Sequence, residues 1–284
     1  QVELFESELK NIFSSKYATC VNSATSALHL SCMAIGLKKG DYLWTAAISF
    51  VASANCAVYC GAKVDFVDID KETFNISLKN LSEKLKKAKK EKKLPKALVV
   101  VHMGGNPCNM SKIKKLSKKY NFKIIEDASH ATGSFYKKQI IGNCKYSDIC
   151  IFSFHPVKII TSGEGGAILT NEKKIYEKTQ IFRTHGIQKD YTKFKKKEKI
   201  GWYYEQQFLG YNYRMSDILA SLGKSQLKKL KLFTNYRNKI FNSYKKLLMK
   251  YNISFQKIEK NDYSSFHLII ILFENKSIRN KVFI

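Results

Sequence analysis

The chain has 284 residues and an apolar content of 44%, which suits one large globular domain or a large domain followed by a small one. No apolar run reaches the roughly 18–20 residues of a membrane-spanning helix, and the first residues lack the pattern of a signal peptide, so we expect a cytoplasmic protein with no membrane partner. The formal net charge of +27 could suggest a nucleic-acid surface, but only four of the 50 basic residues are arginine and the lysines are scattered, which favours a solvated surface and no nucleic-acid partner.

Apolar periodicity predicts alternating helices and strands through the first half of the chain. Ser49 can cap one of these helices, and Gly36 ends another. The expected helices cover 2–15, 24–35, 50–59 and 75–93, and the expected strands cover 17–21, 42–48, 63–67 and 97–101.

The second half continues the alternation with one interruption. A polar, aromatic stretch over 184–213 has no clear period and is typical of a long functional loop. The expected helices are 110–120, 172–182, 216–230 and 233–251, and the expected strands are 122–127, 148–154, 166–170, 253–255 and 266–273. Strands that alternate with helices predict an α/β fold with a mostly parallel sheet.

The seven cysteines form no C-x-x-C pair, and most lie in apolar runs. Cys56 and Cys60 are spaced for one helix face, but no histidine or further cysteine completes a zinc set. We therefore expect buried free thiols and no metal site.

In a parallel sheet, ligands bind beyond the carboxyl ends of the strands. Most of the unexpected polar residues of the chain follow predicted strands, which makes that edge of the sheet the candidate site. The segments concerned are 22–25, 49–50, 102–106, 127–130 and 153–158.

Small residues follow the first strand, at 22–27, where a helix is predicted to begin. Backbone N–H groups and hydroxyls at such a position can bind a phosphate at the positive end of the helix. An ordinary helix cap is an equally good interpretation. The segment contains neither G-x-G-x-x-G nor a Walker lysine, which lowers the case for a nucleotide cofactor.

Asp127 ends an apolar strand and is followed by Ala128, Ser129 and His130. A carboxylate here could keep a pyridinium nitrogen protonated, and His130 could donate a hydrogen bond to a phenolic oxygen on the same ring. The alternatives are a helix cap or a Mg²⁺ ligand for Asp127 and a structural role for His130.

Lys158 lies between an apolar strand and a glycine-rich turn. A partly desolvated lysine has a lowered pKa and can form a Schiff base with pyridoxal phosphate (PLP). Ser153, at the end of the strand, could bind the phosphate of that cofactor. The alternative is a surface lysine, which is the usual role of lysine in so basic a chain.

Together these segments are similar to the sugar aminotransferases of the DegT/DnrJ/EryC1/StrS family. The match extends along the chain in the family's order and spacing. The segments that carry it are 22–29, 48–55, 126–133, 153–158, 163–166 and 210–215.

The resemblance implies a PLP-dependent transferase of fold type I, with a mostly parallel seven-stranded sheet in a large domain (1–233). It implies a smaller C-terminal α+β domain that begins in 234–284 and that the chain does not complete. It also implies a homodimer with shared active sites. The site residues it implies are Lys158 for the Schiff base, Asp127 for the pyridinium nitrogen, Phe50 on the ring, Ala24, Thr25 and Ser153 for the phosphate, His130 beside the ring, and Asn212 for the phosphate in the neighbouring subunit.

Within the family, the resemblance implies transfer of an amino group from L-glutamate to the C4 keto group of a UDP-linked 4-keto-6-deoxy-N-acetylhexosamine, as in pseudaminic acid biosynthesis. A different nucleotide-linked keto sugar and a non-catalytic, truncated cofactor-binding module are the alternatives.

Overall fold

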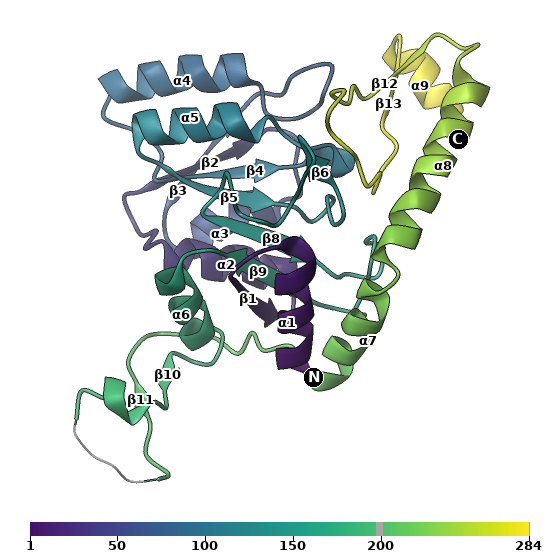
Figure 1. Cartoon of the computed structure of the whole chain (residues 1–284). Coiled ribbons are helices and arrows are strands. Elements are labelled where there is room, and N and C mark those ends of the chain that lie inside the picture. The colour runs from purple at the N-terminus through teal and green to yellow at the C-terminus, as the bar shows by residue number, and fades with distance from the viewer. Residues whose placement is uncertain (197–200, 284) are drawn as a thin grey trace.

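The fold is described from a computed structural model of residues 1–196 and 201–283. Its centre is a seven-stranded sheet with the order β1-β9-β8-β5-β4-β2-β3 (Figure 1). Neighbouring strands from β8 to β3 are parallel, whereas β9 is antiparallel to both β1 and β8. The strands are β1 (Tyr17–Val21), β2 (Tyr42–Ala46), β3 (Lys63–Val67), β4 (Ala97–Val101), β5 (Lys123–Asp127), β8 (Ile149–Ser153) and β9 (Gly166–Thr170). The expected mostly parallel α/β sheet is therefore confirmed.

Helices cover both faces of this sheet, and each face has its own hydrophobic core. Successive strand residues point to opposite faces, so Ile124 of β5 packs in one core and Ile125 in the other. One core is completed by α1 (Val2–Phe13), α4 (Leu78–Lys90), α5 (Met110–Tyr120) and α7 (Asp217–Leu227), and the other by α2 (Ala24–Ala34), α3 (Ala52–Tyr59) and α6 (Lys173–Phe182).

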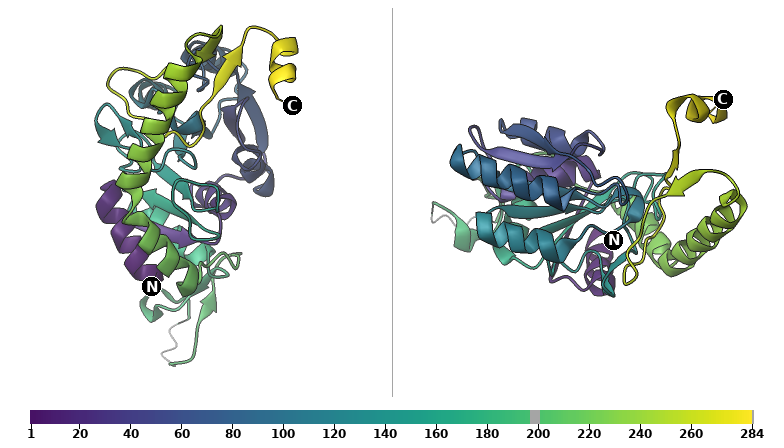
Figure 2. Two further views of the ribbon diagram at one scale, coloured as in Figure 1. Left: turned by 90° about the vertical axis from the view of Figure 1, so that its right-hand side faces the viewer. Right: turned by 90° about the horizontal axis from the view of Figure 1, so that it is seen from above.

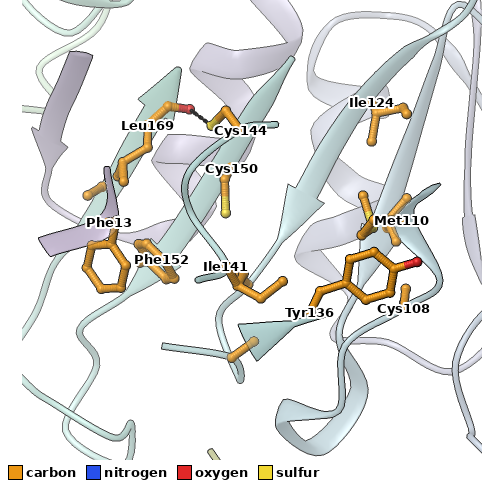
Figure 3. Close-up of a cluster of buried hydrophobic side chains, with 14 of the residues drawn as sticks. Phe13, Cys108, Met110, Ile124, Tyr136, Ile141, Cys144, Cys150, Phe152 and Leu169 are labelled. Carbon is orange, nitrogen blue, oxygen red and sulfur yellow. Dashed lines mark hydrogen bonds between the residues drawn. The ribbon is translucent and has the colours of Figure 1, made fainter. Parts of the chain in front are cut away.

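Figure 3 shows part of the first core, where Phe13 of α1 packs against Phe152 of β8. All seven cysteines are free, and all except the half-buried Cys60 are buried, as expected. Their burial raises the pKa of the Cys144 and Cys150 thiols. No group of three metal-ligating side chains occurs within residues 1–196 and 201–283.

A long helix, α8 (Leu230–Leu248), runs along the edge of the body and leads to a small C-terminal region (Figures 1 and 2). That region contains β12 (Ile253–Phe255), β13 (Ile271–Phe273) and α9 (Lys276–Val282). Its irregular segment, 256–270, returns to the large body of the molecule, where Tyr263 bridges Phe135 of β6 (Phe135–Tyr136). β6 pairs with β7 (Gln139–Ile140) in a separate two-stranded sheet. No helix in the described part of the chain is long and apolar enough to cross a membrane.

Two local predictions are wrong, and a third is refined. The strand expected over 266–273 is confined to Ile271–Phe273, and at the expected start Phe266 adopts a left-handed conformation with φ of 46°, which does not fit a strand. Ser49 does not cap a helix, since α3 begins at Ala52. The stretch over 184–213 is not wholly irregular: β10 (Ile187–Gln188) pairs with β11 (Glu205–Gln206), and a short 3₁₀ helix, η2 (Tyr191–Lys193), precedes residues 197–200, which lie outside the described residues.

Candidate active site

Two strand ends meet at a single glycine on the carboxyl edge of the sheet. Val21, the last residue of β1, and Ser153, the last residue of β8, both pair with Gly166 at the start of β9. The segments that follow β1 and β8 in the chain therefore begin side by side. This register places the start of α2 next to the loop that carries Lys158.

Gly166 allows these segments to approach closely. A Cβ atom at this position would lie 2.6 Å from the backbone nitrogen of Ala24 and 2.7 Å from the carbonyl oxygen of Ser23. These distances are too short for any side chain, so a residue larger than glycine would push α2 away from the sheet.

A cavity of about 350 Å³ opens at this edge. The volume lies within the roughly 300–1,000 Å³ of small-molecule pockets. Seven of the eight predicted site residues line it, namely Ala24, Thr25, Phe50, Asp127, His130, Ser153 and Lys158.

Lys158 is held by a compact loop between β8 and β9. Its backbone N–H donates to the carbonyl of His155, and the two ends of the loop are joined by a bond from Phe154 N–H to the Gly165 carbonyl. Phe154 is fully buried and packs against Phe5 of α1, which anchors the loop to the core. The glycine-rich turn thus supports the lysine loop.

The Lys158 amine is half-buried, and this burial lowers the pKa of its ammonium group below the ordinary value, although the nearby Asp127 carboxylate acts in the opposite direction. Desolvation disfavours the charged form of lysine, and a neutral amine is the nucleophilic form. The predicted reactive character of Lys158 therefore has a physical cause in the structure.

Asp127 ends β5 and is 4% exposed. Its Oδ2 accepts a hydrogen bond from the Ser53 hydroxyl at 2.7 Å, and its Oδ1 accepts one from the Ser129 N–H at 3.1 Å. The carboxylate is thus fixed in orientation at one wall of the cavity.

His130 lies three residues beyond Asp127, with its Nδ1 buried and without a hydrogen-bond partner. Burial, reinforced by the charge of Lys158, lowers the pKa of the imidazole to about 4, and Asp127 opposes that change. The ring is therefore uncharged near neutral pH and can donate one hydrogen bond.

The amino end of α2 forms another wall of the cavity. Ser23 caps the helix by accepting a hydrogen bond from the Ser26 N–H at 3.0 Å. The N–H groups of Ala24 and Thr25, in the first turn, have no intrahelical acceptor. This half-exposed helix end is a suitable position for a phosphate.

Phe50 lines the mouth of the cavity, and 68% of its surface is exposed. Asn212 is absent from the lining of the cavity and lies beside Thr184, with which it forms a backbone bridge. The neighbouring Tyr213 carbonyl accepts a hydrogen bond from the Asn22 N–H, which ties this segment to the start of α2. The predicted role of Asn212 in a neighbouring subunit stays a prediction.

Sequence reasoning also misplaced one segment and missed two residues. The loop 102–106 packs against the C-terminal segment, and a Cβ on Gly105 would lie 2.8 Å from the His130 carbonyl oxygen. Ser53 was missed although it lies within one of the matching motifs, 48–55. His267 was missed because no motif marked it, yet its Nε2 lies 3.5 Å from the Lys158 Nζ.

The chemistry of the lining fits PLP. Lys158, with its lowered pKa, suits the aldehyde of the cofactor, and the buried carboxylate of Asp127 suits the pyridinium nitrogen. The free amino end of α2 suits the phosphate. This pocket, on a sheet of this order, defines a PLP-dependent transferase of fold type I. The chain belongs to the DegT/DnrJ/EryC1/StrS aminotransferase family, whose sequence pattern it matches over residues 1–284. Enzymes of this family use PLP, and a PLP form of a putative sugar aminotransferase from Streptococcus pneumoniae is among the similar structures.

Several relatives cover most of the chain. It is 43% identical over 274 residues to a Campylobacter jejuni UDP-4-amino-4,6-dideoxy-N-acetyl-β-L-altrosamine transaminase, a match that spans 96% of this chain and 68% of the relative. It is 33% identical to an Escherichia coli O157:H7 GDP-perosamine synthase, across 95% of this chain and 69% of that protein.

The fold of the chain is also similar to solved structures of aminotransferases. The Helicobacter pylori aminotransferase PseC, involved in the biosynthesis of pseudoaminic acid, superposes with a TM-score of 0.85 at 32% identity, over 99% of this chain and 72% of PseC. A family member from Brucella abortus superposes with a TM-score of 0.87, over 97% of this chain and 70% of its own, and at 23% identity it supports the fold alone.

Proposed function

We propose that the chain transfers the amino group of L-glutamate to the C4 keto group of a UDP-linked 4-keto-6-deoxy-N-acetylhexosamine, in pseudaminic acid or related surface-sugar biosynthesis. The observation that carries the proposal is the convergence of Lys158 and Asp127 on one cavity at the carboxyl edge of the sheet. The choice of sugar is supported by the 43% identity to the Campylobacter jejuni transaminase and by the likeness to PseC.

In this proposal, each wall of the cavity binds one part of the cofactor. Lys158 binds PLP covalently, and Asp127 keeps the pyridinium nitrogen protonated. His130 donates a hydrogen bond to the phenolic oxygen, and Phe50 stacks on the ring. The phosphate is bound by the start of α2, at Ala24 and Thr25, together with Ser153.

When bound, PLP carries the amino group and acts as an electron sink for the carbon atom that loses a proton. The Lys158 Nζ, once free of the cofactor, takes the proton from the Cα of glutamate, and later supplies a proton to the C4 carbon of the sugar. This task requires a neutral amine, which the burial of Lys158 favours.

We also propose that the active unit is a cytoplasmic homodimer in which Asn212 reaches the cofactor phosphate of the other subunit. The proposal is supported by the position of Asn212 outside its own cavity and by two exposed apolar side chains in the lining of the cavity, Phe50 and Val157. Measuring the molar mass by sedimentation equilibrium, with and without PLP, tests the dimer. A monomeric mass in both states contradicts it.

The function is tested by incubating the PLP-loaded chain with L-glutamate and matched UDP-, GDP- and dTDP-linked 4-keto sugars, with 2-oxoglutarate and the amino sugar as readouts. We expect amination of the UDP-linked sugar at C4. The similarity to GDP-perosamine synthases makes a GDP-linked keto sugar the second candidate, and a preference for it would replace the first. No amino product from any of the three would indicate the non-catalytic alternative.

A further inference from the structure

One side chain of the C-terminal region reaches the reactive lysine. The Nε2 atom of His267 lies 3.5 Å from the Nζ atom of Lys158, although the two residues are 109 positions apart in the chain. The His267 ring also packs on the His130 ring, with their centroids 4.5 Å apart and an angle of 39° between their planes. A single imidazole therefore contacts both a lysine and a histidine that line the cavity.

The segment around His267 is fixed by several independent contacts. Arg237 of α8 donates hydrogen bonds to the carbonyls of Phe266 and His267, at 3.1 and 3.4 Å. The Ser265 hydroxyl donates to the carbonyl of His130 at 3.0 Å. These bonds attach the segment to the loop after β5 through Ser265 and to α8 through Phe266 and His267.

The backbone just before His267 is strained. Phe266 has a φ of 46°, a left-handed conformation that is unfavourable for a phenylalanine. The conformation is held by the stacking of its ring on Phe241, with centroids 4.0 Å apart. Strain of this kind persists where the surroundings impose it, and here its effect is to direct the next residue, His267, toward Lys158.

The electrostatic setting of His267 allows its ring to accept a hydrogen bond. Burial, with help from the charges of His130, Lys158 and Arg237, lowers the pKa of its imidazole to about 3. The neutral ring has one bare nitrogen, and Nε2 is the nitrogen that faces the amine, which allows the Lys158 amine to donate and His267 to accept. Besides His267, the titratable groups that act on the amine are Asp127 and His130.

We propose that His267 is a positioning residue that accepts a hydrogen bond from the Lys158 amine and holds the amine and the His130 ring in place at the cavity. The inference rests on the proposed role of Lys158 and adds a third residue to it, one contributed by the C-terminal region. His267 acts through Lys158 and His130.

The test separates hydrogen bonding from packing with three variants. His267→Leu keeps the bulk and removes the acceptor, His267→Gln keeps an acceptor, and Leu268→Ala shortens the exposed neighbour on the same segment as a matched control. Melting temperatures with and without PLP establish that each variant is folded. A Leu variant that does not fold is replaced by His267→Met, which has the same expected outcome.

The first readout requires no catalysis. The cofactor-free chain is reductively methylated with formaldehyde over a range of pH, and the labelling of Lys158 is followed by peptide mass spectrometry. A hydrogen bond to a charged group is worth ~1.5–3 kcal/mol, so loss of the acceptor should lower the labelling midpoint of Lys158 by about one pH unit or more in His267→Leu. His267→Gln and Leu268→Ala should keep the wild-type midpoint.

The second readout is kinetic. In the PLP-loaded enzyme, His267→Leu should lower kcat at least ~10-fold with KM for glutamate within about twofold, and His267→Gln should recover most of the loss. A wild-type labelling midpoint in His267→Leu, or an equal shift in Leu268→Ala, overturns the inference. The labelling result stands even if the wild-type chain aminates no sugar, so failure of the proposed function is distinguishable from failure of this inference.

Discussion

The hydroxyl of Ser53 donates a hydrogen bond to the carboxylate of Asp127 over 2.7 Å, and both residues are buried. Ser53 lies on α3 and Asp127 ends β5, so the bond joins a helix on one face of the sheet to one wall of the cavity. It fixes the direction in which the carboxylate points before any cofactor is bound.

Replacing Ser53 with alanine should weaken PLP binding. A buried hydrogen bond to a charged group is worth ~1.5–3 kcal/mol, so we expect the Kd for PLP to rise about tenfold or more in Ser53→Ala, measured by absorbance titration. Ser49→Ala, which changes the same type of residue in the segment leading to α3, should leave the Kd unchanged. Equal Kd values for Ser53→Ala and the wild type contradict this role.

Replacing Gly166 with alanine should displace the start of α2, which forms one wall of the cavity. The new Cβ would meet the backbone of Ser23 and Ala24 at 2.6–2.7 Å, which forces α2 to shift and should cost about 1–3 kcal/mol of unfolding free energy. Urea unfolding measures this cost, and PLP affinity should fall with it. Gly201→Ala is the matched control, since within the described residues nothing beyond the chain neighbours of Gly201 lies within 4 Å of the added Cβ. Equal stability of the two variants contradicts the argument.

Acid should destabilise the chain through its two neighbouring histidines. The folded-state pKa is about 4 for His130 and about 3 for His267, compared with 6.5 in the unfolded chain. Because the unfolded state binds more protons below pH 6.5, the free energy of unfolding should fall as pH drops from about 6.5 toward 3–4. The double variant His130→Gln/His267→Gln should flatten this part of the curve in urea titrations. An unchanged slope in the double variant excludes these histidines as the cause.

The ion pair of Arg183 and Glu6 should be important for stability. Both side chains are largely buried, and the Glu6 carboxylate also accepts a hydrogen bond from the Cys20 N–H at 2.7 Å. Arg183→Ala would leave this carboxylate buried without its partner, at a cost of ~3 kcal/mol.

The exposed pair of Lys257 and Glu72 provides the comparison. Lys257→Ala should change the free energy of unfolding by less than about 1 kcal/mol. Thermal unfolding of both variants tests the difference, and similar melting temperatures for the two would contradict it.

The local apolar pattern of the sequence predicted most strands of the main sheet. The strands of the main sheet are short apolar runs flanked by helical periodicity, and three of the polar residues that follow them, Asp127, Ser153 and Lys158, line the cavity. These predictions succeed because residues near a strand end in the sequence are also near it in space. The roles predicted for these three residues stay predictions.

The remaining site features depend on contacts between distant segments. His267 reaches Lys158 only because the segment 256–270 packs against the loops after β4 and β5, and no local sequence pattern predicts that contact. The apolar run 266–273 also resembles a strand, but the stacking of Phe266 on Phe241 holds its first residue in a left-handed conformation. The division into domains at 233/234 falls within α8 and stays a prediction.

The central claim is that Lys158 is the residue that binds PLP covalently. The most direct measurement is borohydride reduction of the PLP-loaded chain, followed by peptide mass spectrometry to locate the pyridoxyl group. We expect the group on Lys158, and its loss together with the visible absorption band of bound PLP in Lys158→Ala. A pyridoxyl group on another lysine, or an absorption band that persists in Lys158→Ala, would contradict the account.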